Sequence, residues 1–263
     1  MKVYQFKGLL QNNEWITPAY VTVSKKGKIK SISTSYEGKS PIINLNGYAL
    51  PGFQNAHSHS FQYAMAGLAE KHEIGLESDD FWSWREAMYD LALKVSPKQL
   101  ENIATMLYSE MVRHGYTHVA EFHYLHHDVN GKPYENLAEM GRRLVKAAKK
   151  SGINITLIPI FYQMGGFGKQ PSDKQKRFIS ATSEKYIELI NASLEVCKSY
   201  KGANLGVGIH SLRGVNGEDI INISKNKELK QYPFHIHIAE QLKEIEDSIQ
   251  FQKLRPVEWL LKN

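Results

Sequence analysis

Residues 49–59 read ALPGFQNAHSH, an apolar run that ends in two histidines separated by one serine. From this run onward, short apolar segments alternate with helical stretches. Such alternation is typical of a parallel sheet whose strands are connected by helices. The predicted strands are residues 49–56, 117–123, 153–161, 205–211 and 233–239.

The stretches between these strands carry helix signals. Ser96 is a predicted N-cap, because Pro97 follows it at the first helical position and Gln99 completes a capping box. Gly115 is expected to end this helix in a left-handed conformation. Its predicted apolar face is Leu100, Ile103, Leu107 and Met111. Further helices are expected over residues 136–150 and 183–200, ending in the same manner at Gly152 and Gly202, and another from Pro256.

Polar residues follow the ends of most of the predicted strands, which is where parallel α/β folds place their ligands. We therefore predict the amino-terminal part of a TIM-like (β/α)8 barrel, with about five of its eight strands present. Residues 1–48 show short strands and a turn at Gly27 instead, so they predict a small β segment. The predicted domains are residues 1–48 and residues 49–263.

Composition narrows the class of protein. The longest apolar runs fall far short of the roughly 20 residues that span a bilayer, and the first residues lack a secretory signal pattern. The single Cys197 excludes an internal disulfide and fits a reducing compartment, so we expect a cytoplasmic protein without membrane contact. The net charge of +6 is spread over scattered lysines without aromatic stacking motifs, which argues against nucleic-acid binding. A basic surface would, however, attract a small dianionic acid.

Two histidine clusters carry the chemistry. His57 and His59 lie two residues apart at a strand end, so both imidazoles project to the same side, as metal ligands do. His235 and His237 share one face of the last strand, and Glu240 follows where that strand gives way to a loop. A carboxylate there could move protons to and from a metal-activated water. The alternative is a buried strand with hydrogen-bonded histidines and a solvated glutamate.

These motifs resemble a known family. Residues 51–59 are similar to the "PG…HxH" signature of the amidohydrolase superfamily, whose mononuclear aminohydrolases also carry a histidine and a glutamate spaced as His237 and Glu240 are. Longer segments look like the formimidoylglutamate deiminases in particular, and the match covers the chain from Leu50 onward. Those segments are HSHSFQ (57–62), AMAGL (64–68), DFWSWR (80–85), AEFHYLHH (120–127), HSLR (210–213), HIHIAEQ (235–241) and RPVEWLL (255–261).

The resemblance implies a role for each matching residue. It makes His57, His59 and His237 ligands of one zinc ion, and it makes Glu240 the proton shuttle. It also implies substrate contacts from Gln62, Arg85, Tyr124, His210 and Arg213. An arginine fork suits a carboxylate. Other roles remain open, because Arg213 could pair with a helix acid, Arg85 could stack on an aromatic ring, and Tyr124 could plug the barrel mouth.

The implied reaction is the zinc-dependent hydrolysis of N-formimidoyl-L-glutamate to N-formyl-L-glutamate and ammonia, in histidine degradation. The partner expected is thus a small dicarboxylate, and the expected assembly is a homodimer. Two alternatives are a related aminohydrolase acting on a heterocyclic amidine such as guanine or an adenosine-like compound, and an inactive zinc-binding fragment. Family members continue further and supply a strand-eight aspartate that binds zinc. We therefore expect this chain to be truncated, with the β segment forming half of a composite β-sandwich.

Overall fold

A computed structural model of the protein describes residues 1–67 and 81–263, with the side chains of residues 81–83 also outside the description. The chain divides into two compact units, Met1–Phe53 and Gln54–Asn263. The first unit holds the small β segment. The second holds every residue to which a role in chemistry is predicted.

The first unit is a five-stranded sheet in the order β2-β1-β3-β4, with β5 beside β1. The hairpin between β3 and β4 turns at Gly27, whose positive φ of 73° explains the glycine there, as predicted. Val3, Ala19 and Val21 are the buried apolar residues of this sheet. The strands are β1 (Lys2–Gln11), β2 (Glu14–Ile16), β3 (Ala19–Val23), β4 (Ile29–Ser33) and β5 (Ile42–Ala49).

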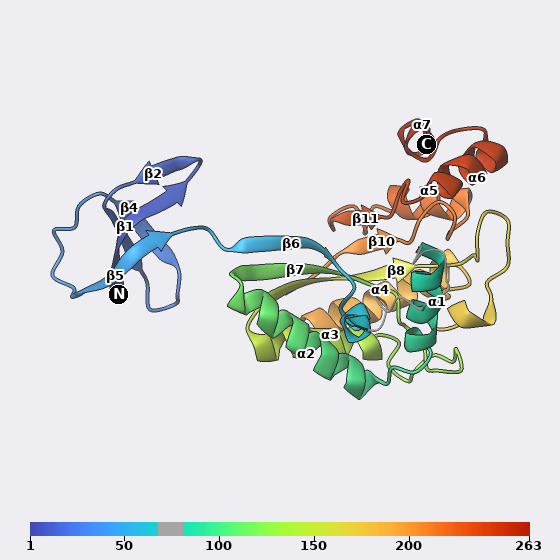
Figure 1. The fold of residues 1–263 in the computed structure, drawn as a ribbon, viewed down its shortest axis with the longest axis horizontal. Coiled ribbons are helices and arrows are strands. Elements are labelled where there is room, and N and C mark those ends of the chain that lie inside the picture. Colours follow the sequence, from blue (N-terminus) through green and yellow to red (C-terminus); the bar gives the residue numbers. More distant parts are fainter. Residues whose placement is uncertain (68–80) are drawn as a thin grey trace. The chain divides into compact units, whose positions relative to one another are not determined.

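The second unit is built on a six-stranded sheet in the order β11-β10-β8-β7-β6, with β9 beside β8 (Figure 1). The pairs β7–β8, β8–β9, β8–β10 and β10–β11 are parallel. Every predicted strand is present, and the fold is the amino-terminal part of a TIM-like barrel. The strands are β6 (Phe53–Ser58), β7 (Tyr116–His123), β8 (Asn154–Phe161), β9 (Ala203–Leu205), β10 (Val207–Ile209) and β11 (Phe234–Ile236).

One predicted strand is observed as two, because Gly206 interrupts it between β9 and β10. A Cβ on Gly206 would lie 2.8 Å from Cγ1 of Ile158, so only glycine allows this close approach to β8. β8 itself is buried at every position after Asn154, which fits a central strand covered on both faces.

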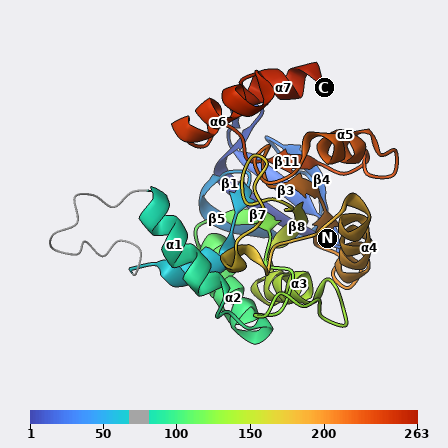
Figure 2. The same cartoon turned by 90° about the vertical axis from the view of Figure 1, so that its right-hand side faces the viewer.

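Helices α2, α3, α4 and α5 follow one another around the outside of this sheet (Figure 2). The predicted start of α2 is confirmed, since Ser96 and Gln99 form both hydrogen bonds of the capping box and Pro97 is the first helical residue. Gly115, at φ 88°, follows its end as predicted. The helices are α1 (Phe81–Ala92), α2 (Pro97–Arg113), α3 (Glu139–Ser151), α4 (Ser183–Cys197), α5 (Gly217–Lys225), α6 (Leu242–Gln252) and α7 (Pro256–Lys262), with 3-10 turns at Ser60–Met65 and Asp173–Gln175.

Two helix boundaries differ from prediction. α3 starts at Glu139, because the side chain of Asn136 accepts a hydrogen bond from the amide of Ala138 at 2.9 Å and forms a turn before the helix. The prediction that Gly202 ends α4 in a left-handed conformation is wrong. That helix ends at Cys197, and Gly202 instead lies so close to Asn154 that a Cβ would approach its Oδ1 to 2.5 Å.

Within the described residues, no helix is both long and apolar enough to cross a membrane.

Candidate metal centre and active site

The side chains with predicted roles gather at the carboxyl ends of the strands. His57 lies at the end of β6 and His59 directly after it, while Tyr124 follows β7. His210 follows β10, and His237 is the first residue after β11. Parallel strands bring these ends to one edge of the sheet, where βα-barrel enzymes place their active sites.

Three imidazoles converge on one point. The Nε2 atom of His57 lies 3.0 Å from Nε2 of His59 and 3.0 Å from Nε2 of His237. One ligand atom from each ring lies within 4.8 Å of the others, so this triad could hold a metal ion. The family resemblance implied this grouping, and the structure brings His57 and His237 together although they lie 180 residues apart in the chain.

The surroundings keep these rings neutral. Burial, together with the neighbouring histidines, lowers the pKa of His59 and of His237 to about 3, and burial also lowers the pKa of His57. The carbonyl oxygen of Phe122 lies 2.8 Å from Nδ1 of His59 and accepts a hydrogen bond from the N–H at that atom. That contact leaves the Nε2 lone pair of His59 facing the other two rings. Neutral imidazoles with converging lone pairs are what zinc sites require.

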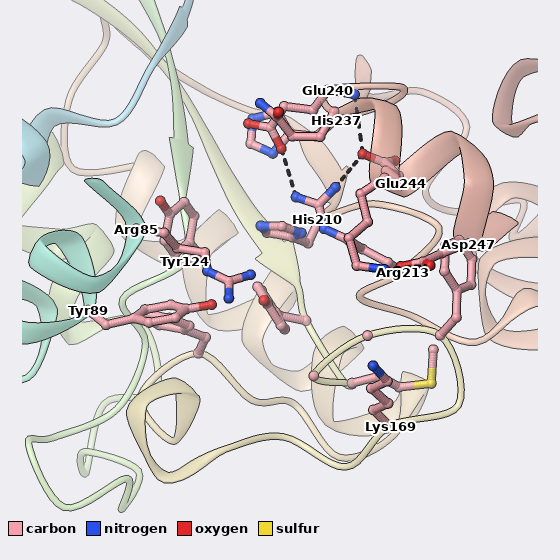
Figure 3. A pocket seen from close by; sticks show the side chains of 18 of the residues that line it. Arg85, Tyr89, Tyr124, Lys169, His210, Arg213, His237, Glu240, Glu244 and Asp247 are labelled. Carbon is pink, nitrogen blue, oxygen red and sulfur yellow. Dashed lines mark hydrogen bonds and ion pairs between the residues drawn. The ribbon is translucent and has the colours of Figure 1, made fainter. Parts of the chain in front are cut away.

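A charged cluster faces the triad. The guanidinium of Arg213 donates to Oε2 of Glu240 at 2.7 Å and to Oε2 of Glu244 (Figure 3). Glu244 also accepts hydrogen bonds from the backbone amides of Ala239 and Glu240, at 3.3 and 3.2 Å. Burial opposes the charge of Arg213, but Glu244 and Glu240 outweigh burial and raise its pKa. Arg213 thus pairs with a helix acid, one of its expected alternatives, while still lining the cavity.

The triad opens into a cavity of about 570 Å³. On one wall, Gln62 donates to the hydroxyl of Tyr124 at 2.9 Å, and the Arg85 guanidinium lies over the Tyr89 ring at 5.7 Å from its centre. Arg85 therefore contacts a tyrosine and lines the cavity at once. His59, His210, His237 and Glu240 line it too, so all the predicted site residues except His57 border this space.

The other histidines of the AEFHYLHH segment lie elsewhere. His123 and His126 are buried in the core, with ring centres 4.9 Å apart, and His126 contacts the carbonyl oxygen of Ile160 at 2.9 Å. His127 contacts the carbonyl oxygen of Ile179 instead. They are structural residues rather than ligands. Leu68 of the AMAGL segment, Asp80 of the DFWSWR segment and the side chains of residues 81–83 lie outside the described residues.

Glu244 is a site residue that the sequence analysis missed. Its side chain is 1% exposed, and it holds both Arg213 and the turn that carries Glu240. Its position in the sequence is a signal that could have identified it. Glu244 lies four residues after Glu240 in the first turn of α6, and a carboxylate there can accept hydrogen bonds from backbone amides that have no partner within the helix.

The comparisons with known proteins show the family of this chain. The profile of the amidohydrolase family matches residues 48–262. The chain belongs to the amidohydrolase family. This amidohydrolase is 47% identical over 223 residues to formimidoylglutamate deiminase from Pseudomonas aeruginosa, which confirms the resemblance predicted from the motifs. That match covers 83% of the chain and 48% of the relative, so the chain spans about half the length of this relative.

Solved structures show the same relationship. The crystal structure of an amidohydrolase from Brucella melitensis superposes with a TM-score of 0.89 at 40% identity, covering 100% of this amidohydrolase and 57% of that chain. An adenosine deaminase from Xanthomonas campestris has a TM-score of 0.73 at 15% identity, covering 99% of this chain and 54% of that one. The second likeness shows a shared fold alone.

Proposed function

We propose that this chain carries the zinc site and much of the substrate pocket of a hydrolase that converts N-formimidoyl-L-glutamate to N-formyl-L-glutamate and ammonia, in histidine degradation. The observation that carries the proposal is the convergence of three Nε2 atoms beside a cavity that His59, His237, Glu240 and Arg213 line. The 47% identity to a formimidoylglutamate deiminase supports the choice of substrate.

The residues present fit zinc. Three imidazole nitrogens are suitable donors, and the atoms that converge are the Nε2 atoms of His57, His59 and His237. The Xanthomonas campestris structure of the same fold contains bound zinc. When bound, zinc supplies a Lewis acid that makes water acidic enough to act as a nucleophile near neutral pH.

Glu240 is the proposed proton carrier. Its carboxylate is 35% exposed, lines the cavity and is oriented by the 2.7 Å contact with Arg213. In the proposed reaction it takes a proton from the attacking water and delivers it to the nitrogen that departs as ammonia. A neutral amine is a far better leaving group than an amide anion, so delivery of this proton decides whether the C–N bond breaks.

The substrate carboxylates are the proposed partners of the two arginines. Both guanidinium groups line the cavity, so we assign one substrate carboxylate to Arg85 and the other to Arg213, which keeps its contacts with Glu240 and Glu244. Gln62, Tyr124 and His210 are the proposed polar contacts that orient the formimidoyl group. A dianion entering this cavity would meet two guanidinium groups, whereas a neutral heterocycle carries no charge for them to bind.

The test is ammonia release from N-formimidoyl-glutamate. We would assay the zinc-loaded 263-residue chain and a chimera in which the carboxyl-terminal half of the Pseudomonas aeruginosa relative follows it. Guanine and adenosine, offered to the same proteins, test the heterocycle alternative. Turnover of the formimidoyl compound by the chain or the chimera supports the proposal. Zinc-loaded proteins that release ammonia only from a heterocycle, or from none of the compounds, would show that the substrate is wrong.

A further inference from the structure

Glu121 is a buried carboxyl on β7 to which the proposed chemistry gives no task. Its side chain is 2% exposed. Burial raises its pKa to about 7, against the opposing effects of the Ser60 amide and of nearby hydroxyl groups. Burying a carboxyl costs free energy unless the surroundings compensate it, so its partners indicate what the carboxyl does.

Those partners surround His59. The backbone amide of Ser60 donates to Oε1 of Glu121 at 2.7 Å. The hydroxyls of Ser58, Ser60 and Tyr108 are close enough to lower the pKa of the carboxyl. Oε2 of Glu121, Oγ of Ser60 and the Tyr108 hydroxyl are all buried and lack a well-aligned partner among the described residues, so small rotations of the hydroxyls would let these groups satisfy one another.

Two consecutive residues of β7 therefore hold two consecutive residues of the turn after β6. The carbonyl oxygen of Phe122 accepts the Nδ1 proton of His59, and the carboxyl of Glu121 accepts the Ser60 amide. The first contact fixes the tautomer of the ring, and the second fixes the backbone from which the ring projects. Such outer contacts orient metal ligands and contribute to metal affinity.

We propose that Glu121 is a positioning residue of the metal centre, which holds the turn after β6 so that Nε2 of His59 faces His57 and His237. This inference rests on the proposed zinc site. It differs from a general packing role, because it requires a hydrogen-bond acceptor at this position and not merely a side chain of the right volume.

Glu101 provides a matched control. It is a second buried glutamate, with a side chain 5% exposed, on helix α2 of the same unit. Its carboxylate pairs with Lys98, Arg143 and Lys150, and so links α2 to α3 instead of contacting the turn beside the triad. Removing either carboxyl disturbs a buried polar cluster, but only Glu121 contacts the backbone next to a proposed ligand.

The experiment compares Glu121→Met, Glu121→Gln and Glu101→Met in the 263-residue chain. We would measure the zinc dissociation constant by competition with a chromogenic chelator, and record the visible absorption of the cobalt-substituted chain. Glu121→Met is expected to weaken zinc binding about 10- to 100-fold and to alter the cobalt spectrum. Glu121→Gln keeps an acceptor for the Ser60 amide, so it should stay within about threefold of the wild type. Glu101→Met should keep wild-type affinity once folded.

Equal zinc affinity in Glu121→Met and the wild type would overturn the proposal, as would an equal loss in Glu101→Met. If Glu121→Met does not fold, Tyr108→Phe removes one hydroxyl from the cluster without changing its volume. Its zinc affinity should then fall by about tenfold, and an unchanged affinity would count against the proposal. A wild-type chain that binds no zinc would contradict the proposed function itself, so the two failures are distinguishable.

Discussion

Two groups of polar side chains face the same cavity and are stabilised in opposite ways. In the triad, burial lowers the pKa of His59 and His237 to about 3, so these rings stay neutral. In the facing cluster, Arg213 lies between Glu240 and Glu244, so its charge is kept by pairing. Desolvation removes charge from the first group, and ion pairing preserves charge in the second.

The difference separates two chemical tasks. The ligand nitrogens of the triad lie within 4.8 Å of one another, and their lone pairs suit a cation. Because the rings are already neutral, none of them has to lose a proton before the cation binds. A carboxylate oriented by an arginine suits proton transfer, because it can accept a proton and return it from a fixed position. Removing a histidine of the triad should therefore affect zinc binding, whereas removing Glu240 should affect proton transfer. Variants of each group test this difference.

The largest expected effect comes from the triad. His237→Ala removes one of three ligands, so we expect zinc affinity to fall by more than about 100-fold and turnover to disappear with it. Glu240→Gln leaves the ligands in place, so zinc should still bind while kcat falls by about 100- to 10,000-fold. Zinc content by atomic absorption and ammonia release from N-formimidoyl-glutamate separate the two outcomes.

Each variant has a control in its own neighbourhood. His235→Ala changes a histidine of the same strand that is outside the triad, and Glu246→Gln changes an exposed acid on α6. Both should retain zinc and turnover. If Glu240→Gln lost zinc as fully as His237→Ala, the separation of a metal-binding wall from a proton-carrying wall would be wrong.

A smaller effect is expected from the charged cluster on stability. Glu244→Leu leaves the largely buried Arg213 with one partner and two backbone amides without an acceptor. We expect the free energy of unfolding to fall by about 2–3 kcal/mol, below the usual cost of breaking a fully buried pair because Arg213 is 22% exposed. Urea unfolding measures it.

The exposed pair Lys198–Glu195 is the reference for that experiment. Its side chains are 63% and 67% exposed, so Glu195→Gln should change the free energy of unfolding by less than about 0.5 kcal/mol. A Glu244→Leu variant as stable as Glu195→Gln would mean that the cluster is not held together by this carboxylate.

The sequence was most informative where the pattern is local. The HxH spacing, the capping box at Ser96 and the apolar run of β8 each depend on neighbours in the chain, and each was predicted correctly. The apolar face of α2 was only partly right. The buried line runs through Leu100, Ala104, Tyr108 and Met111, while Ile103 and Leu107 are half-buried beside it.

Apart from the histidine triad, which the family resemblance implied, contacts between distant segments were beyond sequence reasoning. The substrate role of Arg213 was implied by the family resemblance, yet its pairing with Glu244 depends on how α6 packs over the strand ends. Glu121 looked like one letter of a motif, and only the fold places it under the turn after β6. Gly202 had the spacing of a helix cap, but its close approach to Asn154 comes from tertiary packing.

The last expected effect is a change in how stability depends on pH, and it tests whether burial keeps histidines neutral away from the cavity. Burial, together with the charge of Arg177, lowers the pKa of His123 from 6.5 to about 3. Between pH 6.5 and about pH 3, the unfolded chain binds a proton at His123 that the folded chain does not. The contribution of neutral His123 to the free energy of unfolding is therefore complete above pH 6.5 and is lost as the pH falls towards 3. Glu121, with its raised pKa, contributes with the opposite sign between 4.5 and about 7.

Comparing the pH dependence of unfolding in His123→Leu and in the wild type isolates the contribution of this histidine. We expect the variant's free energy of unfolding to fall less steeply with decreasing pH, by at most about 1.4 kcal/mol per pH unit, which corresponds to one proton. Urea unfolding with a chelator between pH 7 and pH 4 measures the slope without zinc. His114→Gln, at a side chain 62% exposed, is the control outside the core. Parallel slopes for His123→Leu and the wild type would show that the core tolerates a charged imidazole, and the contrast between neutral and paired groups would then hold only at the cavity.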